Sequence, residues 1–123
     1  MVVTPLPAAA SNVTGNSLDL GSVNDFAVNE KFAVQVSIPA TPSLANATTV
    51  TLQLVDSADN VTFTAIAGVA PLVVTGGGSI GGPASSLVYG FAGSVRRYLA
   101  LNAAVLVGAG NNTAVSSTFQ LLF

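Results

Sequence analysis

The chain has 123 residues, no cysteine, no histidine and a formal net charge of −2, and 7% of its residues are charged, against about 25% in an average soluble protein. This length fits one domain, and the missing cysteine and histidine exclude disulfides, thiolate metal sites and the commonest general base. The basic residues, Lys31, Arg96 and Arg97, are too few to neutralise a phosphate backbone, so nucleic-acid binding is not expected.

Half of the residues are hydrophobic, but the most apolar stretch, Ile66–Val74, is interrupted by Gly68 and Pro71. It is much shorter than the roughly 20 residues of a membrane-spanning helix, so no membrane insertion is expected. A chain this apolar and this poor in charge either buries much of its surface against other copies or a large partner, or hydrates its surface with Ser, Thr, Asn and Gln. Composition leaves both explanations open.

The first eleven residues, Met1–Ser11, contain two prolines and no charge. They lack the basic leading region and long apolar core of a signal peptide. The sequence predicts an extended N-terminal arm over residues 1–11, which pairs weakly with a sheet edge, and a single β-sandwich domain over residues 12–123. The first strand of that domain is predicted at Ser17–Leu20.

The middle of the chain shows the alternation of half-buried strands. Glu30–Ile38 and Thr48–Val55 are predicted strands, and residues 56–60 a turn, because Asp and Asn side chains bond to their own backbone in turns. The side chains predicted to face inward are Phe32, Val34, Val36 and Ile38 on the first strand, and Val50, Leu52 and Leu54 on the second.

The remaining segments also read as strands separated by glycine-rich turns. Short strands are predicted at Val61–Ile66, Leu72–Thr75 and Ser86–Phe91, with loops at Gly76–Pro83 and Gly108–Asn112, and a final strand at Thr113–Phe123. The longest strand is predicted at Val95–Val107. Apolar residues fall on both of its faces, so it is expected inside a sheet rather than at an edge. About eight strands and no helix indicate an all-β antiparallel sandwich, most simply a jelly roll.

Two glycine motifs occur in the loop Gly76–Pro83. Gly76–Gly81 fits the dinucleotide pattern G-x-G-x-x-G, but Gly82 and Pro83 follow where a helix is required. Gly77–Gly81 fits the G-x-S-x-G pattern of hydrolases, but the chain has no histidine to activate the serine. We therefore expect that the chain binds no cofactor and is not an enzyme.

Asp56, Asp59 and Asn60 raise the question of a calcium-binding site. An EF-hand loop is excluded because Val61 and Ala67 stand where glycine and glutamate are required. A looser calcium site stays open beside an ordinary turn in which Asp and Asn bond to the backbone. A hydrolytic carboxylate pair is not favoured, because Phe63 is the one aromatic residue nearby to hold a sugar.

Arg97 shares its strand parity with Leu99 and Leu101, which predicts that it faces inward. A buried guanidinium must be paired, and the candidate partners are Asp19, Asp25 and Glu30. We expect one of them to tie the long strand to the early part of the chain. The alternative places Arg97 where the strand emerges into solvent, with Arg96 forming the ion pair instead.

Several segments together resemble the capsid cement, or decoration, proteins of tailed double-stranded DNA bacteriophages. The resemblance is one of spacing and strand order, and the Arg-Tyr-Leu run at Arg97–Leu99 is its most specific part. Ala100 and Ala103 stand where that family often has a basic residue and an aromatic. The segments are Asp19–Gly21, Val28–Glu30, Thr49–Val55, Asp59–Phe63 and Arg97–Asn102.

The resemblance implies a jelly roll, usually a homotrimer, that binds the major capsid protein on the capsid exterior and stabilises joints between its subunits without catalysis. The residues expected at interfaces are Arg96, Tyr89, Tyr98, Lys31, Met1, Pro5 and Pro7. The alternative function is a carbohydrate- or receptor-binding β-sandwich, such as a fibre or adhesin tip. Such a site would need exposed aromatics, and the chain has no tryptophan and two tyrosines.

Overall fold

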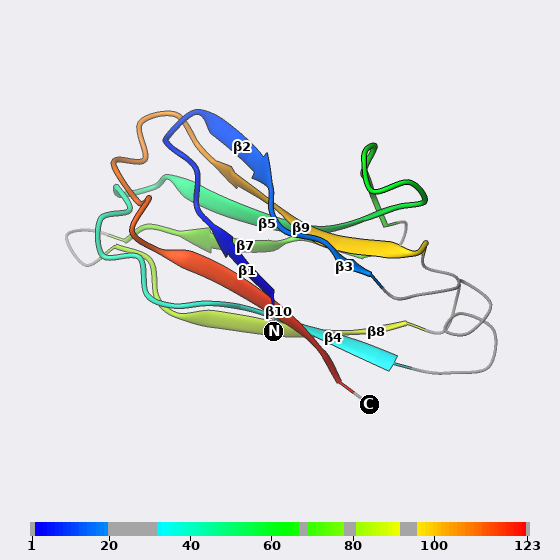
Figure 1. Ribbon diagram of the computed structural model, residues 1–123. Helices are drawn as coiled ribbons and strands as arrows, with labels where there is room; N and C mark the ends of the chain where they lie inside the picture. The colour runs from blue at the N-terminus through cyan, green and yellow to red at the C-terminus, as the bar shows by residue number, and fades with distance from the viewer. Residues whose placement is uncertain (1, 20–31, 67–68, 78–80, 92–95, 123) are drawn as a thin grey trace.

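The computed structural model describes the chain except for residues 1, 20–31, 67–68, 78–80, 92–95 and 123. The described residues form ten β-strands and no helix, arranged as two antiparallel sheets that face each other (Figure 1). The first sheet runs in the order β1 (Val2–Pro5), β10 (Ser116–Leu122), β4 (Phe32–Ile38) and β8 (Ser85–Phe91). No helix of the described residues is long and apolar enough to cross a membrane.

The second sheet is centred on two long strands, β9 (Tyr98–Val105) and β5 (Thr49–Ser57). Two short strands pair with the outer side of β9, and two more pair with the outer side of β5. The short strands are β2 (Ser11–Thr14) and β3 (Leu18–Asp19) on β9, and β6 (Thr64–Ala65) and β7 (Leu72–Thr75) on β5.

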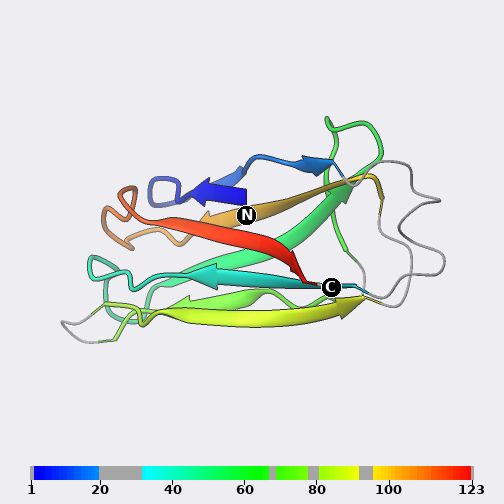
Figure 2. The same ribbon diagram turned by 60° about the horizontal axis from the view of Figure 1, so that its bottom comes forward.

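The connectivity is that of a jelly roll. If β2 with β3, and β6 with β7, each count as one interrupted strand, the sandwich has eight strand positions. The chain changes sheet at every step between them except from β5 to β6–β7, which pair within the second sheet. Figure 2 shows strands of both sheets running side by side along the molecule. The predicted fold class, an all-β antiparallel sandwich of about eight strands, is confirmed.

The core lies between the sheets and is aliphatic. Inward-facing side chains of β4, β5 and β9 are buried at alternate positions, as period-two strands require. The inward assignments made from the sequence for Val34, Val36, Ile38, Val50, Leu52 and Leu54 are confirmed. Phe119 on β10 is also fully buried, as are Leu99, Leu101 and Ala103 on β9.

The strand predicted at Val95–Val107 is central, as expected, but shorter. It lies between β5 and the β2–β3 pair and spans Tyr98–Val105. The strand ends at Val105 because its partner β5 begins at Thr49. The Thr49 carbonyl accepts the last hydrogen bond between the two strands, from the Leu106 N–H. Val107 is consequently 70% exposed, and Val95 lies outside the described residues.

Other strand predictions also need correction. The final strand, predicted from Thr113, begins at Ser116, and β5 continues to Ser57 through two residues of the predicted turn 56–60. The segment Val61–Ile66 forms a strand at Thr64–Ala65 alone, because residues up to Thr62 belong to a turn around Asp59. The prediction of one strand at Ser17–Leu20 missed β2 at Ser11–Thr14, which pairs with β9 ahead of β3.

The N-terminal segment, predicted as an arm, contributes both a strand and core residues. Val2–Pro5 pairs with β10 at the edge of the first sheet, and Thr4 and Leu6 are buried. Val2, Thr4 and Leu6 share one parity, so an extended segment that pairs with β10 directs all three toward the core. The sandwich therefore includes residues ahead of Asn12.

The loop after β2 approaches β1 so closely that it requires glycine. A Cβ atom on Gly15 would lie 2.1 Å from Thr4 Oγ1. We expect Gly15→Ala to lower the free energy of unfolding by about 1–3 kcal/mol, since overpacking a filled site forces neighbours to shift. Gly77→Ala is the matched control, because a Cβ there meets no atom within 4 Å. Denaturant unfolding of both variants measures the difference.

The double variant Thr4→Ala/Gly15→Ala identifies the cause. Removing the threonine Oγ1 and Cγ2 should recover part of the loss, so the two substitutions should be non-additive. Additive losses would show that Gly15 is required for another reason.

Candidate interaction surface

The charged residues that the structure describes gather at one end of the sandwich. Asp56 stands near the end of β5, Arg96 and Arg97 immediately precede β9, and Asp19 ends β3. Antiparallel pairing brings these strand ends together, since Tyr98 lies opposite both Asp19 and Ser57. Asp59 belongs to the turn that follows β5. The remaining charged residues, Asp25, Glu30 and Lys31, lie outside the described residues.

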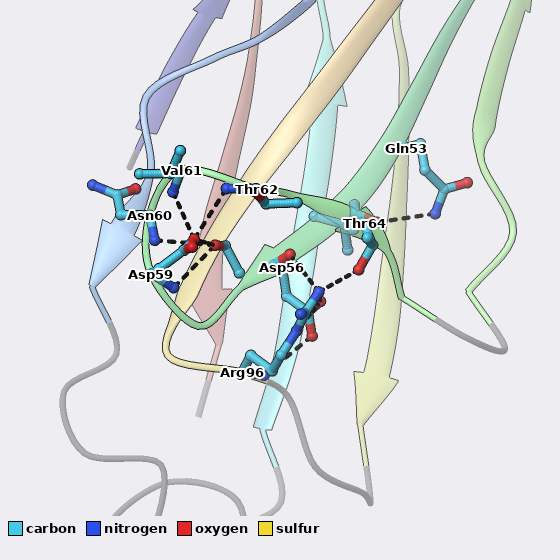
Figure 3. A network of polar contacts seen from close by, with 10 residues as sticks. Gln53, Asp56, Asp59, Asn60, Val61, Thr62, Thr64 and Arg96 are labelled. Carbon is cyan, nitrogen blue, oxygen red and sulfur yellow. Dashed lines mark hydrogen bonds and ion pairs between the residues drawn. The ribbon is translucent and has the colours of Figure 1, made fainter.

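Arg96 and Asp56 form the more buried ion pair at this end (Figure 3). Arg96 Nη2 and Nε donate to Asp56 Oδ1 at 2.7 and 2.9 Å, and the Arg96 backbone N–H donates to Oδ2 at 3.1 Å. Nη2 also donates to the Asp56 carbonyl and to the Thr64 hydroxyl. The Asp56 side chain is 10% exposed and that of Arg96 42%.

Asp56 needs this cation because of its position in β5. It continues the inward parity of Val50, Leu52 and Leu54, so its carboxylate lies at the end of the core, where an unpaired charge would be costly. Because its carboxylate oxygens already accept several hydrogen bonds from Arg96, a calcium site shared by Asp56 and Asp59 is not favoured. Among the described residues, no group of three or more acidic, histidine or cysteine side chains could hold a metal ion.

Asp59 organises the turn between β5 and β6. Its Oδ1 accepts hydrogen bonds from the Val61 and Thr62 backbone N–H groups at 2.9 and 3.0 Å, and from the Ser57 hydroxyl at 2.8 Å. These bonds, Thr62 first, lower the pKa of Asp59 from its ordinary 3.8 to about 2. Asn60 has a positive φ of 61° and accepts a bond from Ser17 at 2.6 Å. The turn is thus the Asx type expected from the sequence.

Arg97 pairs with Asp19, one of its three predicted partners. Nε and Nη2 donate to the two carboxylate oxygens at 2.8 Å each, and the bonds to Asp19 raise the pKa of Arg97. The prediction that Arg97 is buried is wrong: its side chain is 46% exposed and that of Asp19 47%. The strand starts at Tyr98, so parity with Leu99 does not extend back to Arg97. Asp25 and Glu30, the other candidate partners, lie outside the described residues.

The remaining predicted interface residues are scattered. Tyr98 lies beneath the Arg97 guanidinium, 5.1 Å from its Cζ to the ring centroid. Tyr89 packs against the core from β8, and its enclosed hydroxyl has no partner among the described residues; burial raises its pKa. Pro5 is exposed and Pro7 half-buried. Met1 and Lys31 lie outside the described residues.

In the part that the structure describes, the outer faces of both sheets carry one charged strand residue, Asp19, which lies at the charged end of β3 and is paired with Arg97. On the first sheet, a cross-strand bond joins Gln120 Nε2 to Gln35 Oε1 at 2.9 Å, and Val88 lies beside Gln35. The outward residues there are Val3, Pro5, Ala33, Gln35, Ser37, Ser86, Val88, Ser116, Thr118 and Gln120. Those on the second sheet include Asn12, Thr14, Thr49, Thr51, Gln53, Val73, Thr75, Tyr98, Asn102 and Ala104.

The end of the sandwich opposite the ion pairs is uncharged as well. The loops there, residues 6–10, 39–48 and 106–115 (left in Figure 1), contain alanine, proline, glycine, asparagine and threonine but no charged residue. Leu106 and Val107 are exposed on them. Two faces and one end therefore offer neutral surface with scattered apolar side chains. This geometry suits contact with another protein.

Sequence reasoning missed Asp56 as the partner of Arg96, although a signal was present. Continuing the period of Val50, Leu52 and Leu54 by one more step places Asp56 on the inner face. The sequence contains no comparable signal for which apolar side chains stay exposed, because this depends on the order of strands in the sheets. Leu87, Val88 and Val73 are examples.

Comparison with models of protein families gives a match. The family model described as Bbp16 matches residues 6–119, a range that covers most of both sheets. No curated protein matches the chain.

The two ion pairs should differ in their effect on stability. We expect Asp56→Asn to lower the free energy of unfolding by about 2 kcal/mol, because it weakens charge-assisted hydrogen bonds to a mostly buried side chain. Asp19→Asn should have much less effect, because its pair with Arg97 is half exposed. Denaturant unfolding of both variants tests this difference, and equal losses would contradict it.

The turn around Asp59 should contribute a defined acid dependence. Because folding lowers the pKa of this carboxyl from 3.8 to about 2, its stabilising contribution is complete above about pH 4 and is lost as the pH falls through that interval. Asp59→Asn should therefore flatten the fall in melting temperature over this range, measured by circular dichroism. Parallel curves for the variant and the wild type would contradict the assignment.

Proposed function

Since the chain belongs to the Bbp16 family, whose name states neither a ligand nor a reaction, we propose its function from the surface: a structural virion protein that binds the exterior of a capsid. In this proposal it contacts the major capsid protein, bridges joints between capsid subunits and acts as a homotrimer without catalysis. The observation that carries the proposal is the nearly charge-free surface, which covers both described sheet faces and one end.

The physical basis is the burial of neutral surface on both sides of a joint. Apolar area removed from water stabilises by about 25 cal/mol per Å², so about 400 Å² of apolar area across a joint would contribute on the order of 10 kcal/mol before the cost of association. A surface of Ser, Thr, Asn and Gln with scattered valines can be buried without stripping water from charges. Because the same contact is repeated at many joints of a capsid, the contacts together increase the mechanical resistance of the shell.

Two features of the fold support a role as a rigid clamp. The core is continuous between two sheets, and both ion pairs lie at one end of the sandwich. The resemblance to capsid cement proteins supports the same reading, because its most specific segment, Arg97–Leu99, lies at the start of the central strand β9.

The carbohydrate-binding alternative receives little support. Sugar sites use exposed aromatic faces for stacking, and the aromatic side chains that the structure describes, Phe63, Tyr89, Tyr98 and Phe119, are all buried or half-buried. Tyr98 is moreover covered on one side by Arg97.

The test is binding to capsid shells assembled without this chain. The purified protein should co-sediment with the shells and raise the temperature at which they open. Binding should change little between low and high salt, because few charges lie on the described surface and screening acts on charges. Light scattering should give three times the 12.2 kDa of one chain.

Failure to bind such shells would overturn the capsid role, and a monomer in solution would overturn the trimer. Binding that disappears in high salt would show that charged residues, and not the neutral faces, make the contact.

A further inference from the structure

The outer edge of β8 is open in the part of the chain that the structure describes. β8 pairs with β4 over seven consecutive residues, from Ser85 opposite Ile38 to Phe91 opposite Phe32, without a bulge. No described strand pairs with its other side, and the strand lies at the margin of its sheet (Figure 2). Every second residue of an antiparallel strand directs both N–H and C=O away from its partner, so β8 presents a row of such groups at the edge.

The three other sheet edges are short or interrupted. β1 has four residues and ends at Pro5, which has no N–H to donate. The β9 edge is divided between β2 and β3, and the β5 edge between β6 and β7. Short strands, prolines, bulges and charges are the usual means by which proteins prevent edge pairing. β8 has none of these: its sequence, Ser85–Phe91, contains neither proline nor a charged residue.

The side chains along this edge are apolar and partly uncovered. Val88 on the outer face is 57% exposed, and Leu87, whose partner Val36 faces the core, is still 42% exposed at the margin. An open hollow adjoins the beginning of the strand and contains no charged group. It is lined by Ser37, Ile38, Pro39, Ala84, Ser85 and Ser86.

We propose that β8 is a strand-addition site that accepts an extended, uncharged segment of another protein as a further strand of this sheet. The unpaired backbone groups specify an extended occupant, because a β-strand presents its own N–H and C=O groups at the matching spacing. The neutral edge specifies an uncharged one, since a charge placed there would lose water without gaining a partner. The hollow beside Ser85 takes an apolar side chain where the segment runs past the paired residues. This inference rests on the sheet edge and not on the proposed capsid role.

The experiment uses a synthetic peptide with the sequence of β4, residues 32–38, because this neutral sequence already pairs with β8 from the other side. Binding of the fluorescently labelled peptide to the folded protein is measured by anisotropy. Val88→Lys should weaken binding at least tenfold by placing a charge on the edge. Val73→Lys is the matched control, since Val73 is a similarly exposed valine (50%) on β7 and its substitution should leave binding unchanged.

Two peptides with N-methyl groups on alternate residues test the backbone without altering the protein. Methylation of the set that faces β8 should abolish binding, and methylation of the other set should not, because one side of a strand makes the ladder. Equal binding of both peptides, or equal loss with both lysine variants, would overturn the site.

Sedimentation equilibrium tests whether the segment that pairs with β8 comes from another protein or from a second copy of this chain. The wild type and Val88→Lys should have the same oligomeric mass. A lower mass for Val88→Lys would show that a second copy of this chain occupies the edge, which would overturn the proposed partner.

Discussion

The fold depends on the pairing of β5 with β9, which runs from Val50 opposite Val105 to Ser57 opposite Tyr98. These two strands form the middle of the second sheet, and every other strand of that sheet pairs with one of them. The register fixes which side chains face the core, because a slip of one residue would turn every inward side chain outward. It also fixes where the sheet ends, since β9 stops where β5 begins.

The same register explains why two neighbouring arginines have different roles. Asp56 is the last inward position of β5 and lies at the end of the core, so its carboxylate requires a cation. Arg96 supplies it from the segment that leads into β9. Arg97, one residue later, points to the solvent side and reaches Asp19 at the edge of the sheet. The first pair completes the core, whereas the second links β3 to β9 at the surface.

Gathering the described charges at one end leaves the rest of the surface neutral, and this connects the two proposals. Neutral faces can be buried against a partner without desolvating charges, and a neutral edge strand can accept another strand. The three interrupted or proline-terminated edges show that this fold limits pairing elsewhere. In the described part of the chain, the open β8 edge is therefore a local feature that does not follow from composition.

The sequence by itself determined the all-β class, the positions of the long strands and the inward side chains of β4 and β5, because period-two alternation reflects burial directly. It also indicated that Arg97 has a carboxylate partner, although the burial from which this partner was inferred was wrong. Tertiary structure decided which carboxylate each arginine meets and that β1 joins the sandwich. It also decided that the turn after β5 extends to Thr62 and that no described strand pairs with the outer edge of β8. These depend on strand order and on where paired strands end, and such contacts between distant segments leave no periodic signal in a single sequence.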